Sequence, residues 1–328
     1  MSASSPIPVI DMGPLAGADP AARRAAAGRL RHAQEDSGFF YVANHGVPEA
    51  LIRDVLAASR SFHALPIGEK MAIRMNAAHR GYMPMASSVL VTSSVAKVTK
   101  PNMSESFMMM HELPADDPGV LAGAPLQGPN QWPAGLPGFR AAVTAYNDAL
   151  AICARRLVDA VALAFDLPED HFAPHFCRPT TWLRLLHYPP EPPESEADRY
   201  GSAPHTDYGF LTLLAQDDAG GLEIRGRNGG WIPAPPIPGT FVVNVADMLM
   251  RWTNGVLPST PHRVRNLSGR DRYSVPFFYD PDMDTVVAPL ACAVPPGTEP
   301  RFKPVRFGDY VMERLDRNYA YRRAAAGD

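Results

Sequence analysis

The sequence predicts an α+β protein with a mostly β core, and three observations along the chain support this fold class. Helix-start signals and apolar residues at helical spacing occupy much of the first half of the 328-residue chain. From Thr181 to about Val287 the pattern changes to short apolar runs separated by Gly and Pro turns. Residues 302–321 then indicate a final helix packed against that region. The strand pattern by itself predicts an antiparallel sandwich, barrel or jelly roll.

The first elements follow from local signals. Residues 8–11 are predicted to form a short strand, and residues 39–42 a buried strand. Between them, Asp19 is an N-cap candidate with Pro20 at the first helical position, and this helix is expected to run to about Glu35.

Two further helices and a loop-rich stretch complete the first half. Pro48 is expected to open a helix, because an apolar stripe follows at helical spacing, made up of Leu51, Ile52, Val55, Leu56 and Phe62. Residues 76–140 are rich in Met, Pro and Gly and are predicted to form long loops, with one strand near residues 105–110. A long helix over residues 142–165 is then stopped by the Asp-Leu-Pro at residues 166–168.

The residues that carry chemistry lie in the strand-rich region. The imidazoles of His205 and His262 and the carboxylate of Asp207 are the donors of a facial triad, which holds Fe(II) from one side and leaves the opposite positions open. Residues i and i+2 of a strand point the same way, so we expect His205 and Asp207 to reach one ion from a single strand. His262 is expected to arrive from a distant strand.

Arg272 and Ser274 follow shortly after His262 and are again i and i+2. They are predicted to enter the same interior and to form a cationic, hydrogen-bonding socket for a carboxylate, because the planar guanidinium suits bidentate contact. A lone His-x-Asp occurs by chance, whereas the ordered set of five residues is specific. The remaining histidines are expected to be structural. Surface or helix-face positions are predicted for His32, His63 and His79.

Longer stretches around these residues resemble the isopenicillin N synthase-like iron(II)/2-oxoglutarate-dependent dioxygenases. Residues 204–214 read PHTDYGFLTLL, and residues 251–264 contain RWTNG followed by STPHRV. The N-terminal half fits as well, with IPVID at 7–11, SGFFYV at 37–42 and NHGV at 44–47. The resemblance covers roughly residues 6–280 and is least diagnostic after Asp280.

The resemblance implies a double-stranded β-helix, or jelly roll, with an N-terminal helical layer and a C-terminal helix. Residues 1–140 would be the N-terminal dioxygenase region and residues 141–180 a linking long helix. Residues 181–290 would be the jelly-roll core, and residues 291–328 a C-terminal helical extension.

For function, the resemblance implies that oxidative decarboxylation of 2-oxoglutarate is coupled to hydroxylation, desaturation or cyclisation of a small organic molecule. Fe(II), 2-oxoglutarate and O2 are the expected cofactors. His205, Asp207 and His262 are the expected metal ligands and catalytic centre, while Arg272 and Ser274 are expected to hold the far carboxylate of 2-oxoglutarate.

Arg184, Leu186 and Tyr188 alternate along one predicted strand and would share its interior face. The resemblance implies that Tyr188 contacts the cosubstrate or substrate, although a core tyrosine is an equal alternative. A buried Arg184 would be costly unless paired, so it would meet either a second substrate carboxylate or a structural acid. Leu186 stands where plant relatives usually carry Asn, a departure that puts any transfer of their substrate contacts in doubt.

Residues 81–110 are expected to cover the mouth of the barrel, where a loop on a rigid scaffold usually sets specificity. Methionine adapts to irregular shapes, so an apolar or mixed small molecule is expected there. Met83, Met85 and Phe107 are the positions predicted to affect substrate choice.

Other functions compete with this interpretation. Isopenicillin N synthase and aminocyclopropane-carboxylate oxidase share the Arg-x-Ser pair but hold a substrate carboxylate with it, so a 2-oxoglutarate-independent oxidase stays open. A zinc hydrolase would need a general base near the metal and would have no use for the Arg272 socket. A non-catalytic binding protein is disfavoured by the intact triad and socket.

Composition limits the partners and the compartment. The net charge is −3 with a pI near 6.4, and no basic block suggests nucleic acid or an anionic membrane. The three cysteines form no Cys-x-x-Cys pair, which favours a reducing compartment with the thiols buried. We therefore expect a cytoplasmic enzyme, monomeric or weakly oligomeric, with no membrane span.

Overall fold

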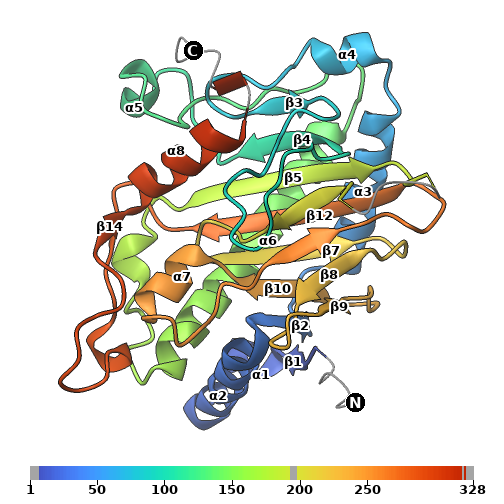
Figure 1. Cartoon of the computed structure of the whole chain (residues 1–328). Coiled ribbons are helices and arrows are strands. Elements are labelled where there is room, and N and C mark those ends of the chain that lie inside the picture. Colours follow the sequence, from blue (N-terminus) through green and yellow to red (C-terminus); the bar gives the residue numbers. More distant parts are fainter. Residues whose placement is uncertain (1–6, 193–197, 320, 323–328) are drawn as a thin grey trace.

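Two β-sheets lie face to face in the computed structural model, which describes residues 7–192, 198–319 and 321–322 (Figure 1). The larger sheet has the strand order β1-β2-β10-β7-β12-β5-β4-β3. Its strands are β1 (Val9–Asp11), β2 (Phe39–Ala43), β3 (Gly81–Met83), β4 (Glu105–Met110), β5 (Thr180–Tyr188), β7 (Leu211–Gln216), β10 (Phe241–Val245) and β12 (Arg272–Asp280).

The smaller sheet has the order β6-β11-β8-β9. Its strands are β6 (Ser202–His205), β8 (Leu222–Arg225), β9 (Trp231–Pro233) and β11 (His262–Val264). A separate pair joins β13 (Val286–Val287) to β14 (Val305–Arg306). Two facing sheets without a closed barrel are consistent with a jelly roll, so the predicted α+β class with a mostly β core is confirmed.

Alternation along the strands of the large sheet builds two separate cores. Odd-numbered residues of β5 and β12, such as Leu183 and Phe277, point to the helices and join the main core. Even-numbered residues such as Leu186 and Tyr188 point to the small sheet, where they pack with Ile224 and other apolar residues. The space between the two sheets is therefore lined by the even-numbered row.

Helices cover the other face of the large sheet, with α2 (Pro20–Ser37) and α3 (Glu49–His63) both packed on α6 (Phe139–Ala164). As predicted, Asp19 caps α2 by accepting a hydrogen bond from the Ala21 amide, at 2.9 Å. The shorter helices are α1 (Gly13–Ala16), α4 (Ile67–Met71), α5 (Pro118–Leu121) and α7 (Asp247–Trp252), with 3-10 turns at Ala173–His175 and Ala291–Ala293.

The C-terminal helix α8 (Phe307–Asn318) lies on the opposite side of the sheet from α6, near the loop that joins β3 to β4 (Figure 1). That loop is tied to the end of α8, since the Val89 amide donates to the Asn318 carbonyl at 3.1 Å. Within the described part of the chain, no helix is both long and apolar enough to cross a membrane.

Among the single residues, His79, Cys177 and Cys292 differ from expectation, whereas His63 and Cys153 agree with it. His63 does lie on a helix face, but it is buried, because its side of α3 faces the sheet. His79 is almost fully buried in a tight turn, with its Nδ1 against the Tyr321 hydroxyl. Cys153 is a buried free thiol, as expected, whereas Cys177 and Cys292 are exposed.

Candidate active site

The two candidate histidine ligands are neighbours across the small sheet. His205 ends β6 and His262 begins β11, and the two residues are paired in the antiparallel register. His205 Nδ1 lies 2.7 Å from the Ala203 carbonyl, and His262 Nδ1 lies 3.3 Å from the Thr260 carbonyl. A ring that donates from Nδ1 keeps a lone pair on Nε2, so both Nε2 atoms can face one ion.

Asp207 completes the group, although not from a strand as predicted. β6 ends at His205, and Asp207 lies in the turn that follows. The start of α7 fixes this turn, because the Asp247 amide donates to the Asp207 carbonyl at 2.9 Å. At Gly209 a Cβ would stand 1.5 Å from Asp280 Oδ1, so only glycine fits there. The contacts of this turn, and not the alternation of side chains along a strand, therefore orient the Asp207 carboxylate.

The three ligand atoms have the spacing of donors around one ion. Asp207 Oδ1 lies 3.7 Å from Nε2 of His205 and 3.7 Å from Nε2 of His262, and all three atoms fall within 4.8 Å of one another. The second carboxylate oxygen, Oδ2, accepts hydrogen bonds from Thr212 Oγ1 at 2.6 Å and Asn244 Nδ2 at 2.8 Å. These partners hold the carboxylate so that Oδ1 faces the two imidazoles.

The protonation states suit metal binding. Burial, followed by repulsion from His262, lowers the pKa of His205, so its imidazole is neutral near pH 7. Burial alone would raise the pKa of Asp207, but the nearby imidazoles and the hydrogen bonds to its second oxygen lower it instead. A neutral imidazole and an ionised carboxylate are the forms that bind Fe(II). The two imidazoles and the carboxylate, each held by a hydrogen bond at the atom that faces away from the site, therefore fit Fe(II), the metal that this set of donors predicts.

Arg272 and Ser274 point into the space between the sheets, as predicted, and both are fully buried. The Arg272 guanidinium donates from Nε to the Gly220 carbonyl, from Nη1 to Ser274 Oγ at 3.2 Å and from Nη2 to Gln216 Oε1 at 3.2 Å. The Tyr188 ring lies against it, 4.8 Å from the guanidinium carbon. The cation is thus held rigidly by groups that do not neutralise it.

Two cavities meet at the triad. The Arg272 cavity, of about 640 Å³ with its open mouth, is lined by Arg272, Ser274 and Tyr188 together with the three triad residues. The second, which we call the α8 cavity, measures about 660 Å³ with its mouth. It contains His205, Asp207 and the following side chains: His79, Leu90, Asn102, Met108, Trp182, Arg184, Tyr208, Phe278, Asp280, Val311, Leu315 and Tyr319. Arg184 and Phe278 line both cavities.

The segment 81–110, predicted to cover the site, does line the two cavities, but not through Met83, Met85 or Phe107. Met83 and Phe107 belong to β3 and β4 and pack in the main core. Neither they nor Met85 line either cavity. The β3–β4 loop instead contributes other residues to the cavity walls, namely Ser88, Leu90, Asn102 and Ser104. Helix α8 was not anticipated as a wall, because an apolar helix face does not reveal what it covers.

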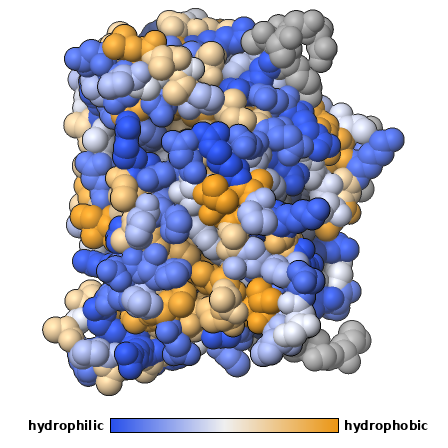
Figure 2. Space-filling view, turned by 90° about the vertical axis from the view of Figure 1, so that its left-hand side faces the viewer, coloured by the Kyte–Doolittle hydropathy of each residue, from blue (hydrophilic) through white to orange (hydrophobic). Residues whose placement is uncertain are grey.

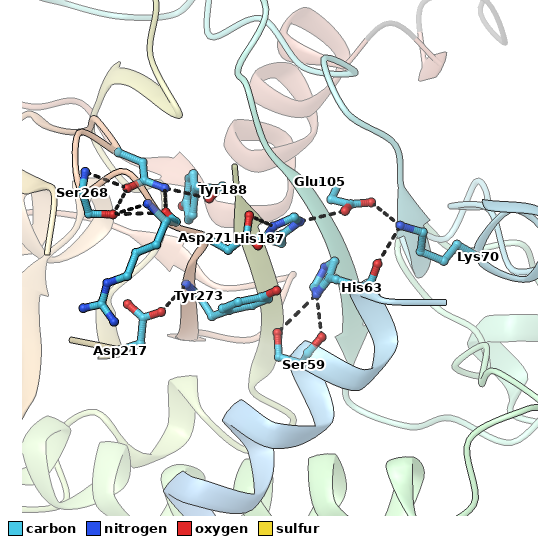
Figure 3. Close-up of polar contacts among 12 residues, drawn as sticks. Ser59, His63, Lys70, Glu105, His187, Tyr188, Asp217, Ser268, Asp271 and Tyr273 are labelled. Atoms are coloured by element: carbon cyan, nitrogen blue, oxygen red, sulfur yellow. Dashed lines mark hydrogen bonds and ion pairs between the residues drawn. The ribbon is translucent and has the colours of Figure 1, made fainter. Parts of the chain in front are cut away.

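A buried polar network lies behind the Arg272 socket, on the helix side of the large sheet (Figure 3). Glu105 accepts from Lys70 Nζ at 2.8 Å and contacts His187 Nδ1 at 2.8 Å, while His187 Nε2 lies 3.0 Å from Asp271. The Tyr273 ring stacks on His187, with centroids 5.0 Å apart. His187 and Tyr273 are the chain neighbours of Tyr188 and Arg272, so this network fixes the outer face of the two strands that form the socket.

Comparison with known proteins identifies both parts of the chain. Residues 7–135 match the N-terminal region of the non-haem dioxygenase in morphine synthesis, and residues 179–281 match the 2OG-Fe(II) oxygenase superfamily. The 2-oxoglutarate-Fe(II) type oxidoreductase hxnY of Emericella nidulans is 35% identical, over 97% of this chain and 93% of its own length. Homoarginine-6-hydroxylase 2-ODD-233 of Oryza sativa subsp. japonica is also 35% identical, over 95% and 97%.

Solved structures agree with these matches. A full-length protein of Neurospora crassa, solved in complex with alpha-KG, has a TM-score of 0.83 at 28% identity, covering 94% of this chain and 95% of that one. A putative 2OG-Fe(II) oxygenase family protein from Caulobacter crescentus has a TM-score of 0.81 at 30% identity, covering 96% and 99%. The chain therefore belongs to the 2OG-Fe(II) oxygenases of the isopenicillin N synthase-like superfamily. It is an oxidoreductase that uses Fe(II), 2-oxoglutarate and O2 and acts on a small molecule.

Proposed function

We propose that His205, Asp207 and His262 hold the catalytic Fe(II), and that the prime substrate occupies the α8 cavity beside them. The observation that carries this proposal is the position of the triad where two cavities meet. One cavity can take the cosubstrate and the other the molecule to be oxidised. When bound, iron and 2-oxoglutarate supply the oxidising power for hydroxylation, desaturation or ring closure.

We further propose that Arg272 and Ser274 bind the far carboxylate of 2-oxoglutarate. An arginine carries five N–H donors, and three of those of Arg272 are engaged with the described residues, which leaves two for a carboxylate. Tyr188 closes one side of this socket by covering the guanidinium face. Burial strengthens the pairing, because no water competes for the two remaining donors.

The remaining chain groups position and protect the reacting atoms. Thr212 and Asn244 keep the Asp207 carboxylate from rotating. The apolar walls of the α8 cavity, including Phe278 and Leu315, would exclude water from the target carbon.

Anaerobic addition of Fe(II) and then 2-oxoglutarate tests the assignment without a substrate. A visible metal-to-ligand charge-transfer band should appear with the wild type and be lost in His262→Ala. A zinc hydrolase, a non-catalytic binding protein or a 2-oxoglutarate-independent oxidase would give no band that depends on 2-oxoglutarate. Absence of the band in iron-loaded wild type would therefore refute the proposal.

We also propose that the enzyme is a monomer or weak oligomer that needs no nucleic acid or membrane partner. The net charge of −3 provides no overall attraction to a polyanion. On the face shown in Figure 2, hydrophobic residues lie in separate groups among hydrophilic ones. The three free thiols favour a reducing compartment such as the cytoplasm. Sedimentation of the purified protein tests the oligomeric state.

A further inference from the structure

Arg184 is a cation in the α8 cavity without an acid of its own. It lies on β5, on the same face as Tyr188, and lines both cavities. The Nε of Arg184 donates to Ser106 Oγ at 2.9 Å, and this hydrogen bond orients the guanidinium group. Among the residues that the structure describes, no carboxylate lies within 4.0 Å of it, whereas the half-buried Arg263 and Arg265 each have one. The structural acid that burial of an arginine would call for is therefore not found in that part of the chain.

The other titratable groups of this cavity do not neutralise Arg184. His79 adds no second cation, since burial, and then the nearby arginines, lower the pKa of its imidazole far below its ordinary value. Asp280 stands on a wall of the cavity, but its Oδ1 accepts the Phe210 amide at 2.8 Å, and burial raises its pKa. Asp207 is directed to the metal. Among the described residues of the α8 cavity, Arg184 is therefore a cation that no carboxylate within 4.0 Å neutralises.

Arg184 and Arg272 occupy different positions along the interior face, although both line the Arg272 cavity. Arg272 pairs with Tyr188 in the β12–β5 register, and Arg184 stands four residues from Tyr188 on β5. At about 3.3 Å per residue, the backbone of Arg184 and that of Tyr188 are roughly 13 Å apart along β5. Arg184 lines the α8 cavity, which Arg272 does not, so a molecule in that cavity can meet Arg184 without contacting the socket.

The rest of the α8 cavity is suited to an apolar, ring-bearing body. Trp182 and Phe278 are cross-strand partners on the floor, and Tyr208, Leu90 and Leu315 provide further apolar surface.

We propose that the prime substrate is a small organic acid whose carboxylate pairs with Arg184 and whose apolar or aromatic body packs on Trp182 and Phe278. This inference rests on the proposed function, because it requires the target carbon to lie between Arg184 and the triad. It makes Arg184 a specificity-determining residue for an anionic substrate.

The test uses the anaerobic enzyme loaded with Fe(II) and 2-oxoglutarate. A library of matched pairs, each an apolar or aromatic carboxylic acid and its primary amide, is incubated with the enzyme, and retained compounds are identified by mass spectrometry. The charge-transfer band is recorded on the same samples. Wild type, Arg184→Met and Arg184→Lys are compared. Arg155→Met is the matched control, because Arg155 is half-buried, is already paired with Asp159 at 3.0 Å and lines neither cavity.

Acids should be retained over their amides by wild type and by Arg155→Met. Arg184→Met should bind the retained acids about ten- to a hundredfold more weakly, the effect of one charge-assisted contact, while Arg184→Lys should recover part of the loss. Equal retention of acids and amides, no retained acid at all, or full retention by Arg184→Met would overturn the inference. Loss of the band in wild type would instead refute the proposed function, so the two failures are distinguishable.

Discussion

Replacing Arg272 by lysine should weaken 2-oxoglutarate binding while leaving the metal site intact. The arginine is fully buried, and three of its five N–H groups are engaged with Gly220, Ser274 and Gln216. One N–H group therefore remains on Nη1 and one on Nη2 for a carboxylate. A lysine ammonium keeps the charge but has three N–H groups without the fork. It therefore loses at least one contact to the cosubstrate as well as the anchor that aims the side chain.

One charge-assisted hydrogen bond is worth about 1.5–3 kcal/mol, so the dissociation constant of 2-oxoglutarate should rise roughly ten- to a hundredfold. The assay is anaerobic titration of the iron-loaded enzyme with 2-oxoglutarate, followed through the charge-transfer band. Arg155→Lys serves as the control, since it makes the same exchange on α6, away from both cavities. An unchanged constant in Arg272→Lys would show that the cosubstrate carboxylate binds elsewhere. A raised prime-substrate constant alone would favour the isopenicillin N synthase type of activity.

Three further predictions concern the metal, the buried network and the core. His205→Ala or His262→Ala should abolish turnover and lower bound iron, measured by metal analysis, with little change in the circular dichroism spectrum; full activity in either variant would exclude the triad. Burial opposes ionisation of Glu105, but its hydrogen bonds, first that from His187, lower the pKa to about 2, so its stabilisation should fade as pH drops below about 4.5. Burial likewise opposes the charge on His187, yet Glu105 and Asp271 raise its pKa, so that contribution should fade as pH rises above about 6.5. Urea unfolding across pH should therefore show greatest stability between these limits, and His187→Gln should remove the alkaline decline; an unchanged decline would exclude His187 as its source. Phe107→Ala should cost about 3–5 kcal/mol of unfolding free energy, because Phe107 is fully buried against Phe62 and Phe139, yet the iron-loaded protein should keep its charge-transfer band. A small loss of stability together with an altered choice of substrate would show that Phe107 contacts the substrate, as the sequence predicted.

The sequence was enough to predict which side chains of the two socket strands face the interior. Arg272 and Ser274 share one face of β12, as the i, i+2 rule predicts, and Tyr188 of β5 lies beside Arg272 on the same face. The rule holds here because β5 and β12 are long strands in regular pairing. The same rule failed for Asp207, since β6 ends two residues earlier and tertiary contacts with α7 aim the carboxylate. Periodicity describes a regular element but does not say where the element stops.

The cavity walls were harder to predict. All six residues of β4 are buried, so its methionines and Phe107 have the same apolar pattern whether they cover a substrate or fill a core. His79 is buried by segments far away in the sequence, including Trp182 and Tyr321, which no local signal connects to it. Arg184 was the exception, because a charged residue on an interior strand face already required a partner.

Helix α8 supplies Val311 and Leu315 to the α8 cavity, with Tyr319 directly after its end, yet it follows all the proposed metal ligands and the socket residues in the sequence. During synthesis the ligands and the socket therefore leave the ribosome before this wall does. A chain shortened before Phe307 would lack this wall and leave the α8 cavity open to water on that side. In such a chain the reacting atoms would lose the apolar side chains that α8 places over them. The last helix to be made is thus the one that completes the enclosure of the site.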